Sequence, residues 1–164
     1  PLLTAAQRRE AFVRQFAQVD PSSWTPRKLG IAYGKPATAS ASLSSHPPRL
    51  AVDGVADNLQ SSWQTDPYPA WLQIDLEKPA KIDRVHVFPY WGGGRFYRYT
   101  VEVSADGKEW KRVADLSDNR KPATPQGDLH KLAPLQARYV RVNMLYHSLN
   151  RGVHLVEVRV FEAP

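Results

Sequence analysis

The sequence predicts an all-β sandwich of about eight short strands, and three observations support this fold class. Hydrophobic residues make up 42% and charged residues 23% of the 164 residues, as in a folded domain with its own core. Fourteen prolines and nine glycines are spread along the chain and indicate many turns. From residue 36 onward, short runs alternate apolar and polar residues, as strands do when one face is buried.

Residues 1–28 are predicted to form a short N-terminal helix and a linker, followed by the sandwich domain of residues 29–164. Thr4 and Gln7 have the spacing of a capping box, and apolar residues recur at helical spacing behind them. We therefore expect a helix from about Ala5 to Gln18. Two prolines and several cap-type residues follow and are typical of a linker.

Strands are predicted wherever β-type runs lie between clusters of turn residues. In chain order they are Ala37–Leu43, Trp71–Glu77, Ile82–Pro89, Tyr97–Ser104, Trp110–Leu116, Asp128–Leu132, Tyr139–Met144 and Leu155–Phe161. Asp106 and Gly107 predict a hairpin, because glycine accepts the positive φ of such turns. Gly92–Gly94 and Ser117–Gly127 are expected to be irregular connections, where β scaffolds commonly carry their binding surfaces.

Composition restricts the possible functions. The absence of cysteine excludes disulfides, Cys-based zinc sites and a thiol nucleophile. No apolar run approaches the roughly 20 residues that span a bilayer. The net charge of +6 comes from scattered basic residues without a dense block, so we expect a solvated surface and no nucleic-acid partner. Neither a Gly-x-Ser-x-Gly nor a His-Glu-x-x-His motif is present, so catalysis is not expected.

Several ordered motifs resemble a known family. They are AVDG, SSW, AWLQIDL, IDRVHVF, GRFYRYTVEVSADGKEW, ARYVRV and GVHLVEVRVF, which run in this order from Ala51 to Phe161. Together they resemble the discoidin or coagulation factor 5/8 type C domain superfamily. Within it, the chain is most similar to the bacterial family 32 carbohydrate-binding modules of the galactose-binding-like fold. The resemblance covers residues 29–161 and implies a jelly-roll β-sandwich.

The resemblance implies a non-catalytic module that tethers a linked catalytic domain to a glycan. The expected ligand is galactose-like or an acidic polysaccharide, and the expected setting is a secreted or cell-surface bacterial enzyme. We expect the module to be a monomer. One alternative is a discoidin-type adhesion domain that grips lipid or protein through apolar loop residues such as Tyr90, Trp91 and Phe96. Another is a scaffold for nucleic acid or protein that uses the basic residues.

The resemblance also implies one structural calcium ion. Asp53 and Gly54 begin a segment rich in turn-forming and oxygen-bearing residues, and calcium takes six to eight oxygen ligands. The expected ligands are Asp53, Asp57, Glu157, Asn58, Ser61 and the carbonyls of Leu50 and Val156. Ser61 and Asn58 are alternatives for one position, because the turn before Trp63 is longer than in the family. In the alternative without metal, Asp53 and Asp57 only cap turns, and Glu157 pairs with Arg159 or Arg141.

Sugar recognition requires an aromatic face and planar polar groups. Such residues stand on the expected loops: Tyr90, Trp91, Arg95, Gln64, Asp66, Tyr68, His147, Asn150, Arg151 and His154. The resemblance implies that these loops meet at one end of the sandwich. Arg95 could instead form a surface salt bridge, and His154 could be a satisfied, partly buried imidazole. Trp63, Trp71 and Trp110 are expected to pack in the core.

Overall fold

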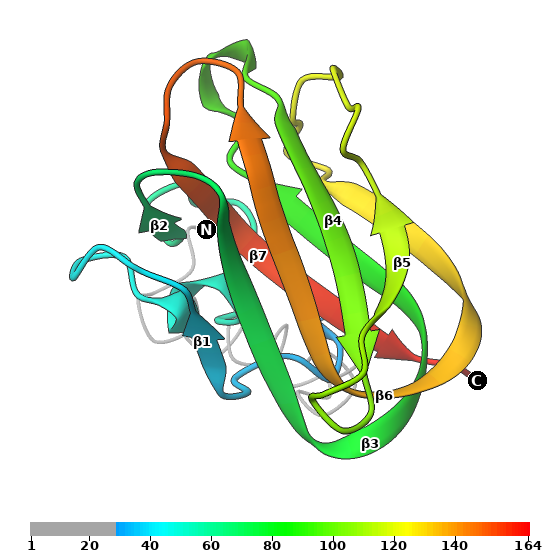
Figure 1. Cartoon of the computed structure of the whole chain (residues 1–164). Coiled ribbons are helices and arrows are strands. Elements are labelled where there is room, and N and C mark those ends of the chain that lie inside the picture. The colour runs from blue at the N-terminus through cyan, green and yellow to red at the C-terminus, as the bar shows by residue number, and fades with distance from the viewer. Residues whose placement is uncertain (1–28) are drawn as a thin grey trace, which may run out of the picture.

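The computed structural model describes residues 29–164, so the predicted N-terminal helix and linker lie outside the described residues. Within that range the chain forms seven strands and two short 3₁₀ helices (Figure 1). They are β1 (Ala37–Ala39), η1 (Pro48–Ala51), β2 (Trp63–Thr65), β3 (Ala70–Pro89), η2 (Gly92–Gly94), β4 (Tyr97–Ser104), β5 (Lys111–Asp115), β6 (Asp128–His147) and β7 (Val153–Glu162).

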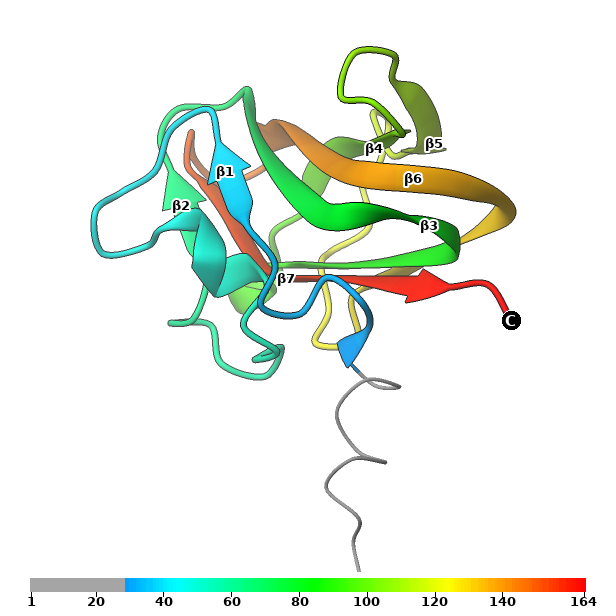
Figure 2. The same cartoon turned by 90° about the horizontal axis from the view of Figure 1, so that it is seen from below.

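The strands form two antiparallel layers that are joined by two long, bent strands. The first layer contains β1, the first half of β3, the second half of β6, β4 and β5. The second layer contains β2, β7, the second half of β3 and the first half of β6. Figure 2 shows β3 and β6 curving from one layer into the other. The predicted all-β sandwich is therefore confirmed.

The bend explains why the predicted strands differ in number from the observed ones. Two predicted strands on either side of Pro79 form the single strand β3, and two around Pro134 form β6. Proline is accepted in a strand where the ladder is irregular, and the β3–β6 register shifts between Asp75 and Ala80. Glu77 has a φ of 68° within this irregular stretch. The prolines thus mark corners of continuous strands and not turns between separate strands.

Other strand boundaries agree to different degrees. The prediction for β4 is confirmed to the residue, and Gly107, with a φ of 77°, lies in the turn that leads to β5. β1 ends at Ala39 and not at Leu43, because the Trp71 amide bonds to the Ser40 side chain at 3.0 Å in place of its carbonyl, and the Leu43 amide bonds to the Gln64 carbonyl of β2. The three-residue strand β2 was not predicted, since it stands between turn-forming residues.

The core lies between the two layers and comes from every second residue of the long strands. In β3, Leu72, Ile74 and Leu76 are buried, while the residues between them are only half-buried. Trp63 is fully buried, as predicted, and its indole nitrogen donates to the Ala41 carbonyl at 3.0 Å.

The core prediction is wrong for two other tryptophans. Trp71 and Trp110 are half-buried and lie against the guanidinium of Arg141. Trp71 belongs to the face of β3 that alternates with its buried residues. Its face is therefore the outer one of the first layer.

Candidate functional site

One end of the sandwich gathers five side chains, which we call the loop-end cluster: Tyr90, Arg95, Tyr97, His147 and His154. The Tyr97 ring stacks on His147, with centroids 4.6 Å apart and 12° between the planes. The Tyr97 hydroxyl lies 3.0 Å from His154 Nδ1 and shares a hydrogen bond with it. Tyr90 packs against His154 at 5.5 Å, and the Arg95 guanidinium lies 4.6 Å from the Tyr90 ring centroid. The predicted loops therefore do meet.

The glycine run shapes this end of the molecule. Gly93 and Gly94 have φ values of 75° and 67°, which glycine adopts without strain. The resulting turn folds the Arg95 side chain back, so that its Nε donates to the Gly92 carbonyl. The guanidinium is thus fixed over Tyr90 at the edge of η2.

Burial keeps the two histidines of the cluster neutral. Desolvation, with smaller contributions from His147 and Arg95, lowers the pKa of His154 to about 4. Desolvation also lowers the pKa of His147, with Arg95 as the second cause. Since His147 Nδ1 lies 3.0 Å from the Gly152 carbonyl, that nitrogen carries the proton. The cluster therefore has one permanent cation, Arg95, beside neutral rings.

Three further predicted residues lie close to the cluster. Gln64 pairs with His154 in the β2–β7 register, and the Gln64 side-chain amide donates to the Ser62 hydroxyl at 2.8 Å. Asn150 accepts the Gly152 amide at 2.8 Å and so shapes the β6–β7 loop. Trp91 is half-buried and makes no ring contact with another residue in the range 29–164. A ring without a packing partner suits ligand stacking, which stays a prediction.

The other predicted ligand residues contribute less directly. Asp66 and Arg151 are exposed, and the Arg151 carbonyl accepts the amide of Tyr68 at 2.9 Å. The Tyr68 ring packs on Tyr146 at 5.5 Å, away from the histidines. Sequence reasoning missed Tyr97, because its place in a strand suggested only core packing.

A second cluster surrounds Glu157, one of the residues named above for the expected calcium ion. The Glu157 side chain is fully buried, its Oε1 accepts the Gly54 amide at 3.1 Å, and its Oε2 has no hydrogen-bond partner in residues 29–164. Burial is the main cause that raises the Glu157 pKa to about 8; Arg159 opposes this shift, and the Asp53 charge adds to it. Arg159 Nε lies 3.6 Å from Oε1. Such a carboxylate gains from an additional positive charge.

Asp53 faces this carboxylate and also organises its own turn. It accepts the Val55 amide at 2.9 Å and the Ser61 hydroxyl. Asp57 and Asn58 are exposed, and Asn58 accepts the Gln60 amide at 2.9 Å. Across the described residues, no group of three or more His, Cys, Asp or Glu side chains is placed to hold a metal. Any cation here would therefore depend on main-chain carbonyls, for which Leu50 and Val156 remain predictions.

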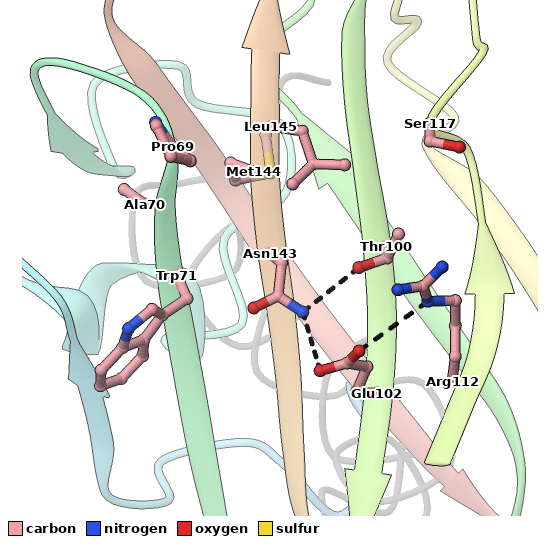
Figure 3. Close-up of a pocket in the computed structure, with 10 residues that line it drawn as sticks. All are labelled: Pro69, Ala70, Trp71, Thr100, Glu102, Arg112, Ser117, Asn143, Met144 and Leu145. Carbon is pink, nitrogen blue, oxygen red and sulfur yellow. Dashed lines mark hydrogen bonds and ion pairs between the residues drawn. The ribbon is translucent and has the colours of Figure 1, made fainter. Parts of the chain in front are cut away.

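A third feature is a groove on the outer face of the first layer (Figure 3), which we call the sheet-face groove. Its volume is about 400 Å³, and it is lined by Pro69, Ala70, Trp71, Thr100, Glu102, Arg112, Ser117, Asn143, Met144 and Leu145. The Asn143 amide donates to Thr100 Oγ1 at 3.2 Å and to Glu102 Oε2 at 3.1 Å. Arg112 Nε lies 3.8 Å from Glu102 Oε1. The sequence analysis identified none of these residues as ligand-binding.

Arg141 extends the same face beyond the groove. Its guanidinium lies 5.1 Å from the Trp71 ring and 3.8 Å from the Trp110 ring, and it donates to Gln73 Oε1 at 2.7 Å. Arg141 was one of the two arginines considered as a partner of Glu157. It does not take that role. Its stacking fixes the positions of both rings on the sheet.

The β-sandwich fold agrees with the family that the chain matches. The F5/8 type C domain family matches residues 36–158, and the chain belongs to this family. No curated protein sequence matches the chain significantly. The family match confirms the resemblance found in the sequence motifs.

Solved structures show the same fold. A family 89 glycoside hydrolase from Clostridium perfringens aligns with a TM-score of 0.70 and 22% identity, over 80% of this chain but 14% of that one. A pectin-binding carbohydrate-binding module gives 0.68 and 22%, over 81% of this chain and 94% of the module. The family 32 module of AlyQ, in complex with 4,5-unsaturated mannuronic acid, gives 0.66 and 21%, over 80% and 98%. The chain thus corresponds to one module and not to the whole hydrolase.

Proposed function

We propose that this module binds a glycan at the loop-end cluster and so holds a linked enzyme, outside the cell or at its surface, close to its substrate. The carrying observation is the convergence of Tyr90, Arg95 and His154, which places an aromatic ring, a cation and a neutral imidazole at one end of the sandwich. Trp91 adds a partly exposed ring beside them. Rings with planar polar groups are what a pyranose needs, and even a weak grip raises the local substrate concentration.

Arg95 favours an acidic glycan over a neutral galactose-like one at this site. Its guanidinium makes no ion pair with a carboxylate in residues 29–164, and its partners there are the Gly92 carbonyl, the Tyr90 ring and the Tyr97 hydroxyl. A guanidinium in that state binds a carboxylate by charge-assisted hydrogen bonds. Two of the structural neighbours are described with pectin and with a mannuronic acid. Uronic acid polymers are therefore the proposed ligand class.

Affinity electrophoresis in gels containing pectin, alginate or galactan tests this proposal. Arg95→Ala should weaken binding to the acidic polymers at least about tenfold, since it removes a charge-assisted contact. Lys111→Ala removes the same charge from the exposed surface of β5 and serves as the matched control. Retardation of Arg95→Ala equal to that of the wild type would contradict the proposed site.

We also propose a structural calcium ion at the Glu157 cluster. Its residues fit a hard cation, because Glu157 supplies a buried oxygen atom without a hydrogen-bond partner in the described chain and the half-buried Asp53 adds a second carboxylate. Asp53 and Glu157 would hold the ion together with nearby main-chain carbonyls. Its charge would stabilise the two carboxylates and tie the turn at Asp53 to β7.

Thermal unfolding of chelator-treated protein tests the calcium proposal. Added Ca²⁺ should raise the melting temperature of the wild type, since a ligand bound only by the folded state stabilises it. Glu157→Gln should abolish the response, and Asp118→Asn, a change at an exposed carboxylate, should retain it. An equal melting temperature with and without Ca²⁺ would contradict the calcium proposal.

Membrane adhesion is a second candidate, supported by one exposed residue. Leu149 is 57% exposed in the β6–β7 loop and lies beside Gly93. Of the apolar residues first considered for this role, Tyr90 packs on His154, and Phe96 on Tyr146. No helix in residues 29–164 has the length and apolarity to cross a membrane. Sedimentation with anionic lipid vesicles, lost in Leu149→Ser, would favour this candidate over glycan binding.

A further inference from the structure

We propose that the sheet-face groove is a second binding site, which takes one neutral pyranose residue of a glycan chain. The proposal goes beyond the loop-end function, because the two sites share no residue. The groove lies across β3, β6, β4 and β5, and Figure 3 shows Asn143 on β6 bonded to Thr100 and Glu102, which both lie on the adjacent strand β4. Four arguments support it: register, hydrogen-bonding capacity, shape and charge.

The sheet register places the site residues abreast. Asn143 of β6 pairs with Trp71 of β3 on one side and with Thr100 of β4 on the other. Glu102 follows two residues after Thr100, so both side chains point to the same face. Side chains on adjacent paired strands hold their spacing better than side chains on loops. The groove is therefore preformed in the absence of a ligand.

Its polar atoms offer both donors and acceptors. The two N–H bonds of Asn143 are directed to Thr100 and Glu102, which leaves the Asn143 carbonyl oxygen without a partner in residues 29–164. The Thr100 hydroxyl accepts one of these bonds and keeps its own proton to donate. Glu102 Oε1 adds an acceptor, and the Arg112 guanidinium adds donors. Arg112 Nε lies 3.8 Å from Glu102 Oε1. Adjacent sugar hydroxyls, each a donor and an acceptor, match this alternation.

An apolar wall faces these polar atoms. This wall consists of the exposed side chains of Pro69 and Leu145, the latter 37% exposed, at the end of the groove away from Glu102, whereas Ala70 and Met144 beneath them belong to the core. The C–H face of a pyranose ring can pack on such a wall while its hydroxyls face the polar side. A phosphate or a metal ion has no apolar surface that could pack on this wall.

Charge selects a neutral sugar. Glu102 is a half-buried carboxylate beside the groove, and Arg112 is shared between Glu102 and Asp115, whose Oδ2 lies 3.0 Å from Arg112 Nη1. Arg141 is paired with Glu102 in the β4–β6 register, so the charges around the groove balance, but it does not line the groove. Arg112, the one guanidinium that lines it, is already paired with two carboxylates, so a uronate or sulfate would find no unpaired cation there, in contrast to the Arg95 end of the molecule.

Nuclear magnetic resonance of the ¹⁵N-labelled full chain tests the proposal. The probes are D-galactose, D-glucose, D-mannose, N-acetylglucosamine, N-acetylgalactosamine and D-galacturonate, each titrated to the order of 100 mM, where weak millimolar binding is measurable. At least one neutral sugar should shift the Asn143 side-chain amide and the Thr100 amide in a saturable way. D-galacturonate should need a higher concentration. The signals of Gly93 and Gly152 report the loop end separately, so the failure of either site is visible alone.

Variants sharpen the result. The groove shifts should persist in Arg95→Ala and weaken at least about fivefold in Glu102→Gln, since a bond to a charged acceptor is lost. Glu109→Gln removes an exposed carboxylate from the β4–β5 hairpin and should change nothing. Absence of groove shifts with all five neutral sugars in the wild type would overturn the proposal. Tighter binding of D-galacturonate than of every neutral sugar would also overturn it.

Discussion

The loop-end cluster and the sheet-face groove combine aromatic and polar groups in different ways. At the loop end, Tyr97 is 1% exposed and is held by direct contact with His147 and His154. On the sheet face, Trp71 and Asn143 are half-buried and are positioned by the strands beneath them. The comparison teaches that the loop-end side chains are part of the buried packing and contribute to stability, whereas Trp71 and Asn143 lie on the outer face of the sheet and contribute less to it.

The largest effect is expected for Tyr97→Ala. Removing a buried aromatic ring should lower the free energy of unfolding by about 3–5 kcal/mol, measured by urea denaturation. Tyr97→Phe keeps the ring and loses only the hydrogen bond to His154, so its cost should be about 1 kcal/mol. Equal costs for both variants would show that the hydrogen bond and not the burial dominates.

A smaller effect is expected for Trp71→Ala on the sheet face. The ring is half-buried and lies 5.1 Å from the Arg141 guanidinium, so the unfolding free energy should fall by about 1–2 kcal/mol. The same denaturation measurement applies. A loss as large as that of Tyr97→Ala would contradict the distinction between the two regions.

The smallest effect is expected from mild acid, to which His147 at the loop end contributes together with His86 and His130 of the second layer. The pKa of buried His147 is held below 6.5, whereas the unfolded chain titrates at the ordinary value. Below pH 6.5 the unfolded state therefore binds more protons, and stability falls as the pH is lowered towards the folded pKa. Between pH 7 and 6 the free energy of unfolding should fall by under about 1 kcal/mol for this histidine. His147→Gln should reduce the slope; an unchanged slope would assign it to other groups.

The sequence predicted best what depends on local pattern. Tyr97–Ser104 alternates apolar and polar residues without interruption, and the β4 boundaries follow it. Pro79 misled the prediction, since a bend within a strand and a turn between strands contain the same residues. The fold also agreed because the ordered motifs resemble a family with a known sandwich. Local pattern and resemblance together thus determined the architecture.

The sites were only partly predictable, since they depend on register. The resemblance placed Tyr90 and His154 at one end of the molecule, but their contact with Tyr97 required the structure. The groove joins Trp71 and Asn143, which are distant in the sequence and meet through one strand pairing. A shift by one residue would turn every such side chain to the other face. No local pattern in the sequence determines which strands pair or in which register.

The bends of β3 and β6 have a consequence for unfolding. Because each strand belongs to both layers, neither layer can lose its hydrogen bonds without disturbing the other. The two layers should therefore open as one cooperative unit. In native-state hydrogen exchange, the amides of Leu72 in the first layer and Val85 in the second should exchange with the same free energy of opening.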